Sequence, residues 1–516
     1  MSVPLIDLFA GPGGLGEGFS AYTGDSEANP FKIALSIEKD PWAHQTLELR
    51  SFFRQFPRSC VPKEYYQYLR GEIDRTTLYE RYPVQAKRAQ QEAWKVELRQ
   101  MRAREVDKRI SDALKGKQNW VLIGGPPCQA YSTIGRSRMR HMNPDTDYDF
   151  EKDHRHFLYR EYLRILRKHN PPVFVMENVK GLLSAKVNGS SMFDKIHRDL
   201  RRKAGNTPGY HIYSFVKQGN GKKLEPEDFI IKSENYGIPQ MRHRVILLGI
   251  RKDLQQDYEV LQKQTDIPTT RDAIHDLPRV RSTLSKEKDS FPAWLSALEG
   301  ALQPEILNSY SKKRVLIKRI GSAIGKAKKG RWQCSGNDGF FSKNNTLGPS
   351  AWLTENEDWF IDARLGGGFC NHGSRGHMRS DLVRYLFASA YAAEKKSSPF
   401  LRHFPKSLLP EHQNVQQSMK SSNFADRFRV QVASKPATTV VSHIAKDGHY
   451  YIHYDPSQCR SLTVREVARL QTFPDNYFFE GSRTQQYYQV GNAVPPLLAR
   501  QLAQVVQGIL VNNAAT

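Results

Sequence analysis

The sequence predicts an α/β protein with a mostly parallel sheet and a second, smaller and irregular domain. Through the first 250 residues, short runs rich in Val, Ile, Leu and Phe alternate with amphipathic stretches. This alternation is typical of buried parallel strands that are connected by helices. From about residue 252 the alternation stops, and Gly, Ser and Asn become common. The change of composition predicts the start of the second domain.

Each apolar run has the length of a strand, and the stretches between the runs have the apolar spacing of helices. Strands are predicted at Pro4–Phe9, Lys32–Ile37, Trp120–Ile123, Val173–Met176, Ile212–Val216 and Val245–Ile250. Helices are predicted at residues 41–56, 156–169, 461–470 and 495–511, with a helical insertion at about residues 62–117.

Composition excludes several classes of protein. The 516 residues are 39% hydrophobic and 25% charged, which is ordinary for a globular protein and argues against disorder throughout. No run of about 18 apolar residues occurs, so we expect no transmembrane helix and no membrane partner. The five cysteines are odd in number and form no C-x-x-C pair. We therefore expect free thiols, no metal site and a cytoplasmic location.

Charge predicts a polyanionic partner. Lys and Arg number 77 against 53 Asp and Glu, which gives a formal net charge of +24. This excess favours nucleic acid, although a basic protein without such a partner could have the same composition. Nine basic residues and no acid lie between Ile306 and Asn337. This stretch predicts a surface that faces phosphates, the alternative being a solvated helix face.

A glycine-rich segment, Asp7–Gly16, follows the first predicted strand. Glycines between a strand and a helix let the backbone approach a nucleotide-type ligand at the carboxyl end of the strand. Glu38 ends the second predicted strand, where an acid can accept hydrogen bonds from ribose hydroxyls. Together these features predict a cofactor that contains adenosine, the alternative being a glycine turn without a ligand.

Reactive side chains flank three other predicted strands. Cys128 lies in a turn shaped by two prolines, and Glu177 ends the next strand. Because the carboxyl ends of parallel strands meet at one edge of a sheet, we expect both side chains to face one cleft. Arg242 and Arg244 alternate before the last strand, so both can point toward a carboxylate, a base carbonyl or a phosphate. The alternatives are a structural cysteine, an ion-paired glutamate and two surface arginines.

In their order along the chain, these motifs resemble those of the DNA cytosine-5 methyltransferases, which depend on S-adenosylmethionine. The resemblance covers about residues 3–50, 118–250 and 436–510. Its segments are Asp7–Gly14, Gly124–Ser132, Glu177–Val179, Gln240–Arg244, Arg460–Pro474 and Gln489–Pro496. It implies a Rossmann-like catalytic domain at residues 1–251, completed by residues 486–516, and a target-recognition domain at residues 252–485.

The resemblance also implies how the reaction proceeds. Cys128 is similar to the nucleophile that attacks C6 of cytosine, which makes C5 reactive toward the methyl group. Glu177 is similar to the residue that holds N3 and the exocyclic amine. Arg244, supported by Arg242, is similar to the arginine that steadies the base carbonyl and the carboxylate. The target cytosine would be flipped out of the duplex.

The same resemblance implies the cofactor contacts, with S-adenosylhomocysteine as the product and no metal, whereas the DNA contacts at Lys326, Lys328, Lys329 and Arg331 are predicted from the basic stretch. No acid is assigned to the adenine, because the insertion offers no match to the family at that strand. The implied cofactor contacts are Phe9, Gly11, Gly13, Gly14, Glu38, Pro127, Leu158, Asn492 and Ala493. The predicted DNA contacts are Gln129, Ser132, Arg136, Arg138, Gln240, Lys326, Lys328, Lys329 and Arg331.

The expected function is methylation of cytosine C5 at a specific sequence in double-stranded DNA. We expect a prokaryotic or phage monomer that works in a restriction-modification or other defence system, with a restriction endonuclease or other defence proteins as candidate partners. A tRNA cytosine-5 methyltransferase of the same fold, a non-catalytic DNA-binding relative and a Rossmann oxidoreductase remain as alternatives. The size and basic loops of residues 252–435 favour DNA. The Pro-Cys-Gln and Glu-Asn-Val segments argue against an oxidoreductase.

Overall fold

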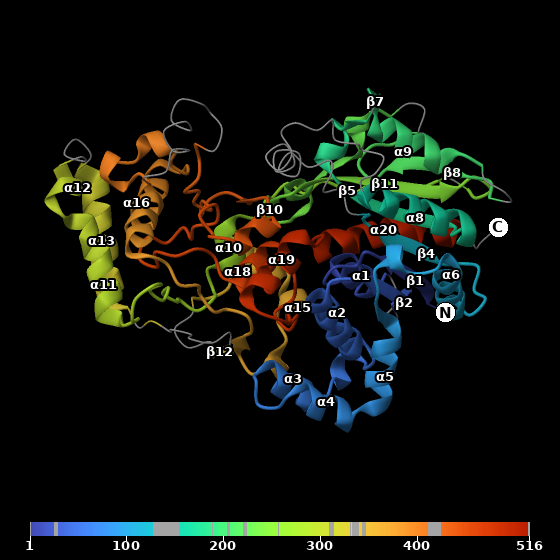
Figure 1. The fold of residues 1–516 in the computed structure, drawn as a ribbon, viewed down its shortest axis with the longest axis horizontal. Helices are drawn as coiled ribbons and strands as arrows, with labels where there is room; N and C mark the ends of the chain where they lie inside the picture. The colour runs from blue at the N-terminus through green and yellow to red at the C-terminus, as the bar shows by residue number, and fades with distance from the viewer. Residues whose placement is uncertain are drawn as a thin grey trace.

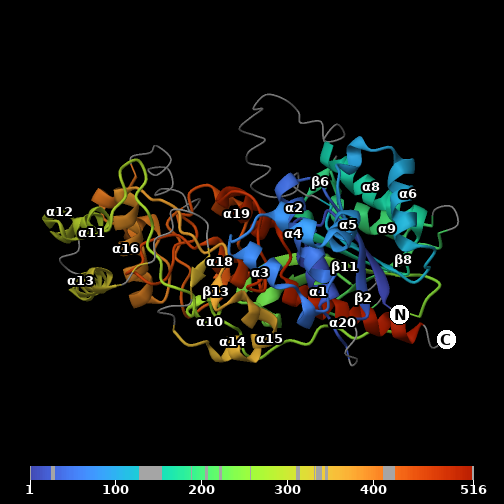
Figure 2. The ribbon, with the colours of Figure 1, turned by 90° about the horizontal axis from the view of Figure 1, so that it is seen from below.

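A computed structural model gives the architecture of the chain. It describes residues 2–24, 29–126, 154–187, 189–203, 207–219, 224–255, 257–308, 314–330, 332, 340–342, 347–410 and 425–513. The molecule is elongated, with a sheet and its helices at one end and a group of helices at the other (Figure 1). The view turned by 90° separates the same two ends (Figure 2).

An eight-stranded sheet forms the core of the larger end. In pairing order its strands are β3 (Ala93–Lys95), β2 (Phe31–Glu38), β1 (Val3–Leu8), β4 (Val121–Gly124), β5 (Val173–Val179), β11 (His243–Arg251) and β8 (Tyr210–Ser214), while β9 (Ile230–Lys232) also pairs with β11. Strands β1 to β5 pair in parallel. Strand β11 is antiparallel to its three neighbours. The predicted α/β class and all six predicted strands are confirmed; β3 and β9 were not predicted.

Helices cover both faces of the sheet, because successive strand residues point to opposite sides. Leu5 faces α1 (Gly14–Ser20) and α20 (Pro496–Asn512) in one apolar cluster. Ile6 belongs to a second cluster, formed with α6 (Ala103–Leu114), α8 (His154–His169) and α9 (Met192–Arg201). The predicted return of the C-terminal helix onto the sheet is therefore confirmed (Figure 1).

The insertion is largely helical, as predicted, but β3 divides it. Helix α2 (Pro41–Arg54) precedes it. Its helices are α3 (Lys63–Leu69), α4 (Arg75–Arg81) and α5 (Pro83–Glu92), followed by β3 and α6. Tyr66 on α3 donates a hydrogen bond of 2.6 Å to Asp362, and Tyr68 donates one of 2.6 Å to Glu480. The insertion thus contacts segments that lie about 300 to 400 residues later in the chain.

Beyond residue 252 the chain has few strands and two apolar clusters. The first contains α11 (Phe291–Glu299), α13 (Arg314–Lys329) and α16 (Arg379–Lys395). The second contains α10 (Thr270–Ile274), α18 (Val464–Leu470) and α19 (Arg483–Asn492). The other helices and strands beyond residue 252 are β12 (Phe341–Ser342), β13 (Gly368–Phe369), β14 (Ala437–Thr438), α12 (Pro304–Asn308), α14 (Ala351–Glu355) and α15 (Glu357–Phe360). Three short strands precede that residue: β6 (Lys186–Val187), which pairs with β7 (Ser190–Ser191), and β10 (Gln240–Met241).

Buried arginines hold this irregular part together. Arg460 binds Glu466 at 2.6 and 2.7 Å, and Arg469 binds Asp475 at 2.5 and 2.6 Å. Arg465 donates to the carbonyl oxygens of Cys370, Pro474 and Tyr477 at 2.7–2.9 Å. All three arginines are at most 1% exposed. Their guanidinium groups satisfy carbonyl oxygens that regular strands would otherwise pair. The division at residues 485 and 486 stays a prediction.

Among the described residues, no helix has the length and apolar character needed to cross a membrane.

Candidate active site

The turn after β1 is shaped by backbone conformations that favour glycine. Gly11 has φ 57° and Gly13 has φ 96°, both in the left-handed region, and Gly13 is the N-cap of α1. Phe9 also has a positive φ, of 58°. A Cβ atom built on Gly11 would meet no atom within 4 Å. The turn therefore borders open space at the carboxyl end of β1, where an adenosine-containing cofactor would fit.

The C-terminal part of the chain closes this turn from behind. A Cβ atom on Gly14 would lie 2.2 Å from the carbonyl oxygen of Val494, so only glycine fits there. The turn before Val494 carries the predicted contacts Asn492, which is exposed, and Ala493, which is buried. Gln471 holds this turn by donating to the carbonyl oxygens of Val490 at 2.8 Å and Ala493 at 3.4 Å. The two predicted cofactor segments thus lie side by side.

Glu38 lies at the same edge, at the end of β2. One carboxylate oxygen accepts a hydrogen bond of 2.7 Å from the backbone N–H of Gly11, and the other accepts from Lys39 and Asp40 at 2.8 Å. Burial raises the pKa of this carboxyl, and the backbone donors oppose that effect. The carboxylate is therefore fixed beside the glycine turn. Leu158 is buried on α8.

The structure also supplies an acid at the end of β3. Glu97 follows this strand by two residues, and its side chain is 30% exposed. Its carboxylate lies 3.6 Å from the Lys39 ammonium group, one residue after Glu38. Sequence analysis missed this position because a three-residue strand inside a helical stretch gives almost no pattern. The one available signal was the run Ala93–Val96, which is followed by an acid.

The chain that leads to Cys128 passes directly beside Glu177. A Cβ atom on Gly125 would lie 2.8 Å from a carboxylate oxygen of Glu177. Gly124 has φ 148°, and a Cβ atom there would lie 2.2 Å from the carbonyl oxygen of Leu8. The two glycines therefore allow β4 to end between β1 and β5. The predicted site residues Pro127, Cys128, Gln129, Ser132, Arg136 and Arg138 lie outside the described residues.

Glu177 and Arg244 form an ion pair of 2.9 Å between neighbouring strands. Strand β5 places Glu177 opposite Ile246 of β11, so Arg244 lies two residues along from that pair. Their side chains are 16% and 12% exposed. Burial lowers the pKa of the Arg244 guanidinium, and Glu177 opposes that effect. The predicted pairing of a carboxylate with an arginine is thus present at the sheet edge.

Arg242 and Gln240 are located in the interior. Arg242 is 2% exposed and donates to the carbonyl oxygens of Val440 at 2.7 Å and Gly491 at 3.3 Å. Gln240 is fully buried, and its amide donates to Leu470 and accepts from Val440. Arg242 therefore supports the site from behind, by joining β10 to the segments around β14 and α19. Gln240 has the same joining role and does not face a surface that DNA could reach.

The predicted basic stretch forms α13 at the far end of the molecule (Figure 1). Lys326 and Lys329 line a hollow in this part of the chain, whereas Lys328 is exposed and does not line it. Arg331 lies outside the described residues. No group of three or more His, Cys, Asp or Glu side chains that could hold a metal occurs in the described part of the chain.

Comparison with known proteins identifies the family of the chain. The family model described as C-5 cytosine-specific DNA methylase matches residues 82–508. This chain belongs to that family. The methylase is 32% identical to the type II methyltransferase M.Bpa9945I of Bacillus paralicheniformis, over 98% of this chain and 99% of the relative. It is 27% identical to the DNA (cytosine-5-)-methyltransferase M.ApeKI of Aeropyrum pernix, over 77% of this chain and 83% of the relative.

Solved structures show the same fold. A prophage-encoded E. coli protein described as a DNA modification methyltransferase matches the methylase with a TM-score of 0.53 and 18% identity. The match covers 99% of this chain and 100% of that protein. The methylase therefore has the mixed α/β, Rossmann-like fold of DNA methyltransferases.

Proposed function

We propose that this DNA cytosine-5 methyltransferase modifies a flipped-out cytosine at a specific sequence in double-stranded DNA, through a covalent bond between Cys128 and C6. The observation that carries the proposal is the close approach of Gly125 to Glu177. A Cβ atom on Gly125 would lie only 2.8 Å from a carboxylate oxygen of Glu177. Cys128 follows Gly125 by three residues in the sequence, and we assign to it the attack on a base that is held by Glu177.

The chain's own residues activate the base. The Cys128 thiolate adds to C6 while Glu177 donates to or protonates N3, which breaks the aromaticity of the ring and makes C5 nucleophilic. After the methyl group is added, C5 loses its proton, the bond between sulfur and C6 breaks, and the ring becomes aromatic again. Arg244 fixes the Glu177 carboxylate through their 2.9 Å ion pair and is within reach of the base carbonyl.

The methyl donor is S-adenosylmethionine, which supplies an electrophilic methyl group when it is bound. The glycine turn at Gly11 and Gly13 would receive it, with Glu38 toward the ribose and Phe9 beside the adenine. We add Glu97 as a candidate for the adenine amine, because it follows β3 at the same edge and lies near Lys39. Asn492 would contact the cofactor from the C-terminal segment, and no metal takes part.

The proposed biological role is protection of DNA in a restriction-modification system. The relatives named type II methyltransferases are similar over nearly the whole length of this chain. A restriction endonuclease with the same recognition sequence is the expected partner. We propose that the protein acts as a monomer in the cytoplasm of a prokaryotic cell, with the irregular half around α13 and α16 bound to the target sequence.

The test replaces the nucleophile. Bisulfite sequencing of DNA from cells that express the wild-type protein should show methylated cytosines at one sequence, and Cys128→Ser should show none. The control is Cys60→Ser, because Cys60 is an exposed free thiol outside the site. A duplex that contains 5-fluorocytosine should form a denaturation-resistant adduct with the wild type and not with Cys128→Ser. Methylation of tRNA but not DNA, or full activity of Cys128→Ser, would overturn the proposal.

A further inference from the structure

The irregular half contains a hollow of about 1000 Å³ that the proposed chemistry does not use. Helices α10, α13 and α16 form its walls, together with residues 432–434 and 453–458. The volume lies at the upper end of the range of ligand sites in proteins. Because α13 carries the basic stretch of the sequence, cations lie along one wall of the hollow.

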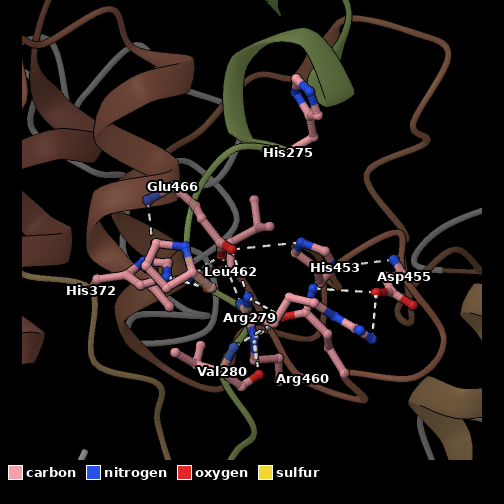
Figure 3. Close-up of polar contacts among 12 residues, drawn as sticks. His275, Arg279, Val280, His372, His453, Asp455, Arg460, Leu462 and Glu466 are labelled. Carbon is pink, nitrogen blue, oxygen red and sulfur yellow. Dashed lines mark hydrogen bonds and ion pairs between the residues drawn. The ribbon is translucent and has the colours of Figure 1, made fainter. Parts of the chain in front are cut away.

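The acids at the floor of the hollow are already paired. Figure 3 shows Arg460 and His453 directed toward Glu466, and Arg279 toward Asp455. Arg460 lies 2.6 Å from Glu466, and Arg279 lies 3.3 Å from Asp455. Burial lowers the pKa of His453 to about 4, with Arg460 adding to this effect. At neutral pH this histidine is therefore uncharged, and the floor has little net charge.

The cations on the walls have no such partners. On α13, Arg319, Lys326 and Lys329 line the hollow at positions i, i+7 and i+10, which is one face of a helix. The Nε atom of Arg319 is buried and has no hydrogen-bond partner among the residues that the structure describes. Two more cations come from facing elements, Arg271 on α10 and Lys396 after α16. In the described part of the chain, none of the five forms an ion pair.

Five like charges around one hollow repel one another unless an anion lies between them. We propose that the hollow binds phosphate groups of the DNA backbone next to the target site. This inference rests on the proposed function, because DNA is the phosphate-rich partner of a DNA methylase. It differs from the earlier expectation for the basic stretch in two ways. It adds Arg271, Arg319 and Lys396 to the phosphate contacts, and it removes Lys328.

The structure offers a matched pair of variants on the same helix. Lys326→Ala with Lys329→Ala removes two cations from the hollow. Lys318→Ala with Lys328→Ala also removes two exposed lysines of α13, but neither lines the hollow. All four lysine side chains are exposed, so neither double variant should unfold the protein. Each phosphate contact adds about 0.9 to the slope of log affinity against log salt.

The measurement is the affinity for an unrelated linear duplex over a series of salt concentrations, because phosphates carry no sequence information. We expect the hollow variant to flatten the slope by about 1 to 2 units and the control variant to leave it nearly unchanged. Arg271→Ala, on the opposite wall, should flatten the slope by up to about one further unit. Equal effects of the two double variants, or no effect of either, would overturn the proposal.

A free phosphate compound could also occupy the hollow, and a second arm of the experiment separates this case. Calorimetric titration of the wild type with inorganic phosphate and with dTMP should give no binding that is tighter than millimolar. Tight dTMP binding that is lost in the hollow variant, with an unchanged DNA salt slope, would contradict the assignment to DNA. The proposed function is tested separately, since DNA affinity does not depend on methyl transfer. Failure of wild-type methylation would leave the slope comparison intact.

Discussion

The two halves of this methylase are ordered by different interactions. In the sheet half, backbone groups pair strand to strand, and apolar side chains alternate between two helix-covered faces. In the irregular half, buried arginines bind carbonyl oxygens and carboxylates that have no strand partner. Arg465, for example, donates to three carbonyl oxygens and is fully buried. Strand pairing and apolar burial stabilise the sheet half. In the irregular half, charged hydrogen bonds add to the two apolar clusters.

This difference predicts which substitutions should affect the reaction and which should affect folding. A change at the sheet edge is expected to alter the reaction more than the folding, since Glu177 and Arg244 lie at strand ends and their side chains are partly exposed. A change of a buried arginine alters folding with no direct contact to the reaction, because it leaves buried acceptors unpaired. Four variants test this separation and are given in order of decreasing effect.

Glu177→Gln should give the largest effect. The amide keeps the size of the side chain but cannot protonate N3, and help of this kind is worth about 10²–10⁴-fold in rate. We expect the rate of methyl transfer to fall by that factor, with the melting temperature close to the wild type. Single-turnover methylation and thermal melting measure the two quantities. The control is Glu234→Gln, since Glu234 pairs with His243 at the start of β11 and not with Arg244. A loss below about tenfold for Glu177→Gln would assign base activation to another group.

Arg469→Met should act on stability in the irregular half. Arg469 is fully buried and binds both Asp276 and Asp475, so its removal leaves two buried carboxylates without their cation. Loss of one partner from a buried ion pair costs about 3–5 kcal/mol. Urea unfolding should show this loss in the free energy of unfolding.

The matched change in an exposed pair is Arg379→Met. Arg379 contacts Glu287 at 2.8 Å, but both side chains are more than one-third exposed. We expect little change in stability, because exposed ion pairs are screened by solvent. If both variants cost the same, buried arginines do not order this half in the way that we describe.

Asp7→Asn should give a smaller, pH-dependent effect in the sheet half. Burial raises the pKa of the Asp7 carboxyl to about 8 from its ordinary value of 3.8. Between these values the unfolded chain is deprotonated while the folded chain keeps the proton, so stability falls as pH rises. The Asn variant should lack this fall and should melt at a higher temperature than the wild type at pH 8. The control, Asp266→Asn, replaces an exposed aspartate and should follow the wild type. Parallel melting curves of wild type and Asp7→Asn from pH 5 to 8 would contradict the raised pKa.

Most of the sheet was predictable because apolar runs of strand length alternate with helices. The pattern could not give β3, since three residues carry no periodicity, and it could not give the antiparallel direction of β11. The helices α2, α8, α18 and α20 were predicted to within a few residues. In the irregular half, the sequence does not show which arginines are buried and which are exposed. Burial of Arg465 and Arg469 depends on contacts with residues about 100 to 200 positions away.

The candidate site was predictable in part, because its residues follow strands that meet at one edge. The positions of Gly125 and Glu177 follow from this rule. The contact of Glu177 with Arg244 does not, because Arg244 begins β11, and only the antiparallel direction of that strand brings its start to this edge. The interior positions of Gln240 and Arg242 do not follow from it either, because both residues precede a strand and their partners come from β14 and α19. The difference between Lys326 and Lys328 could not be predicted either, since it depends on which face of α13 meets α16.

The contact of Gly14 with Val494 has a consequence for biosynthesis. Helix α1 leaves the ribosome hundreds of residues before its packing partner α20. The turn at Gly11 and Gly13 therefore has no support from behind until residue 494 has been made. Fragments that stop short of residue 494 keep most of the strands but cannot close that turn.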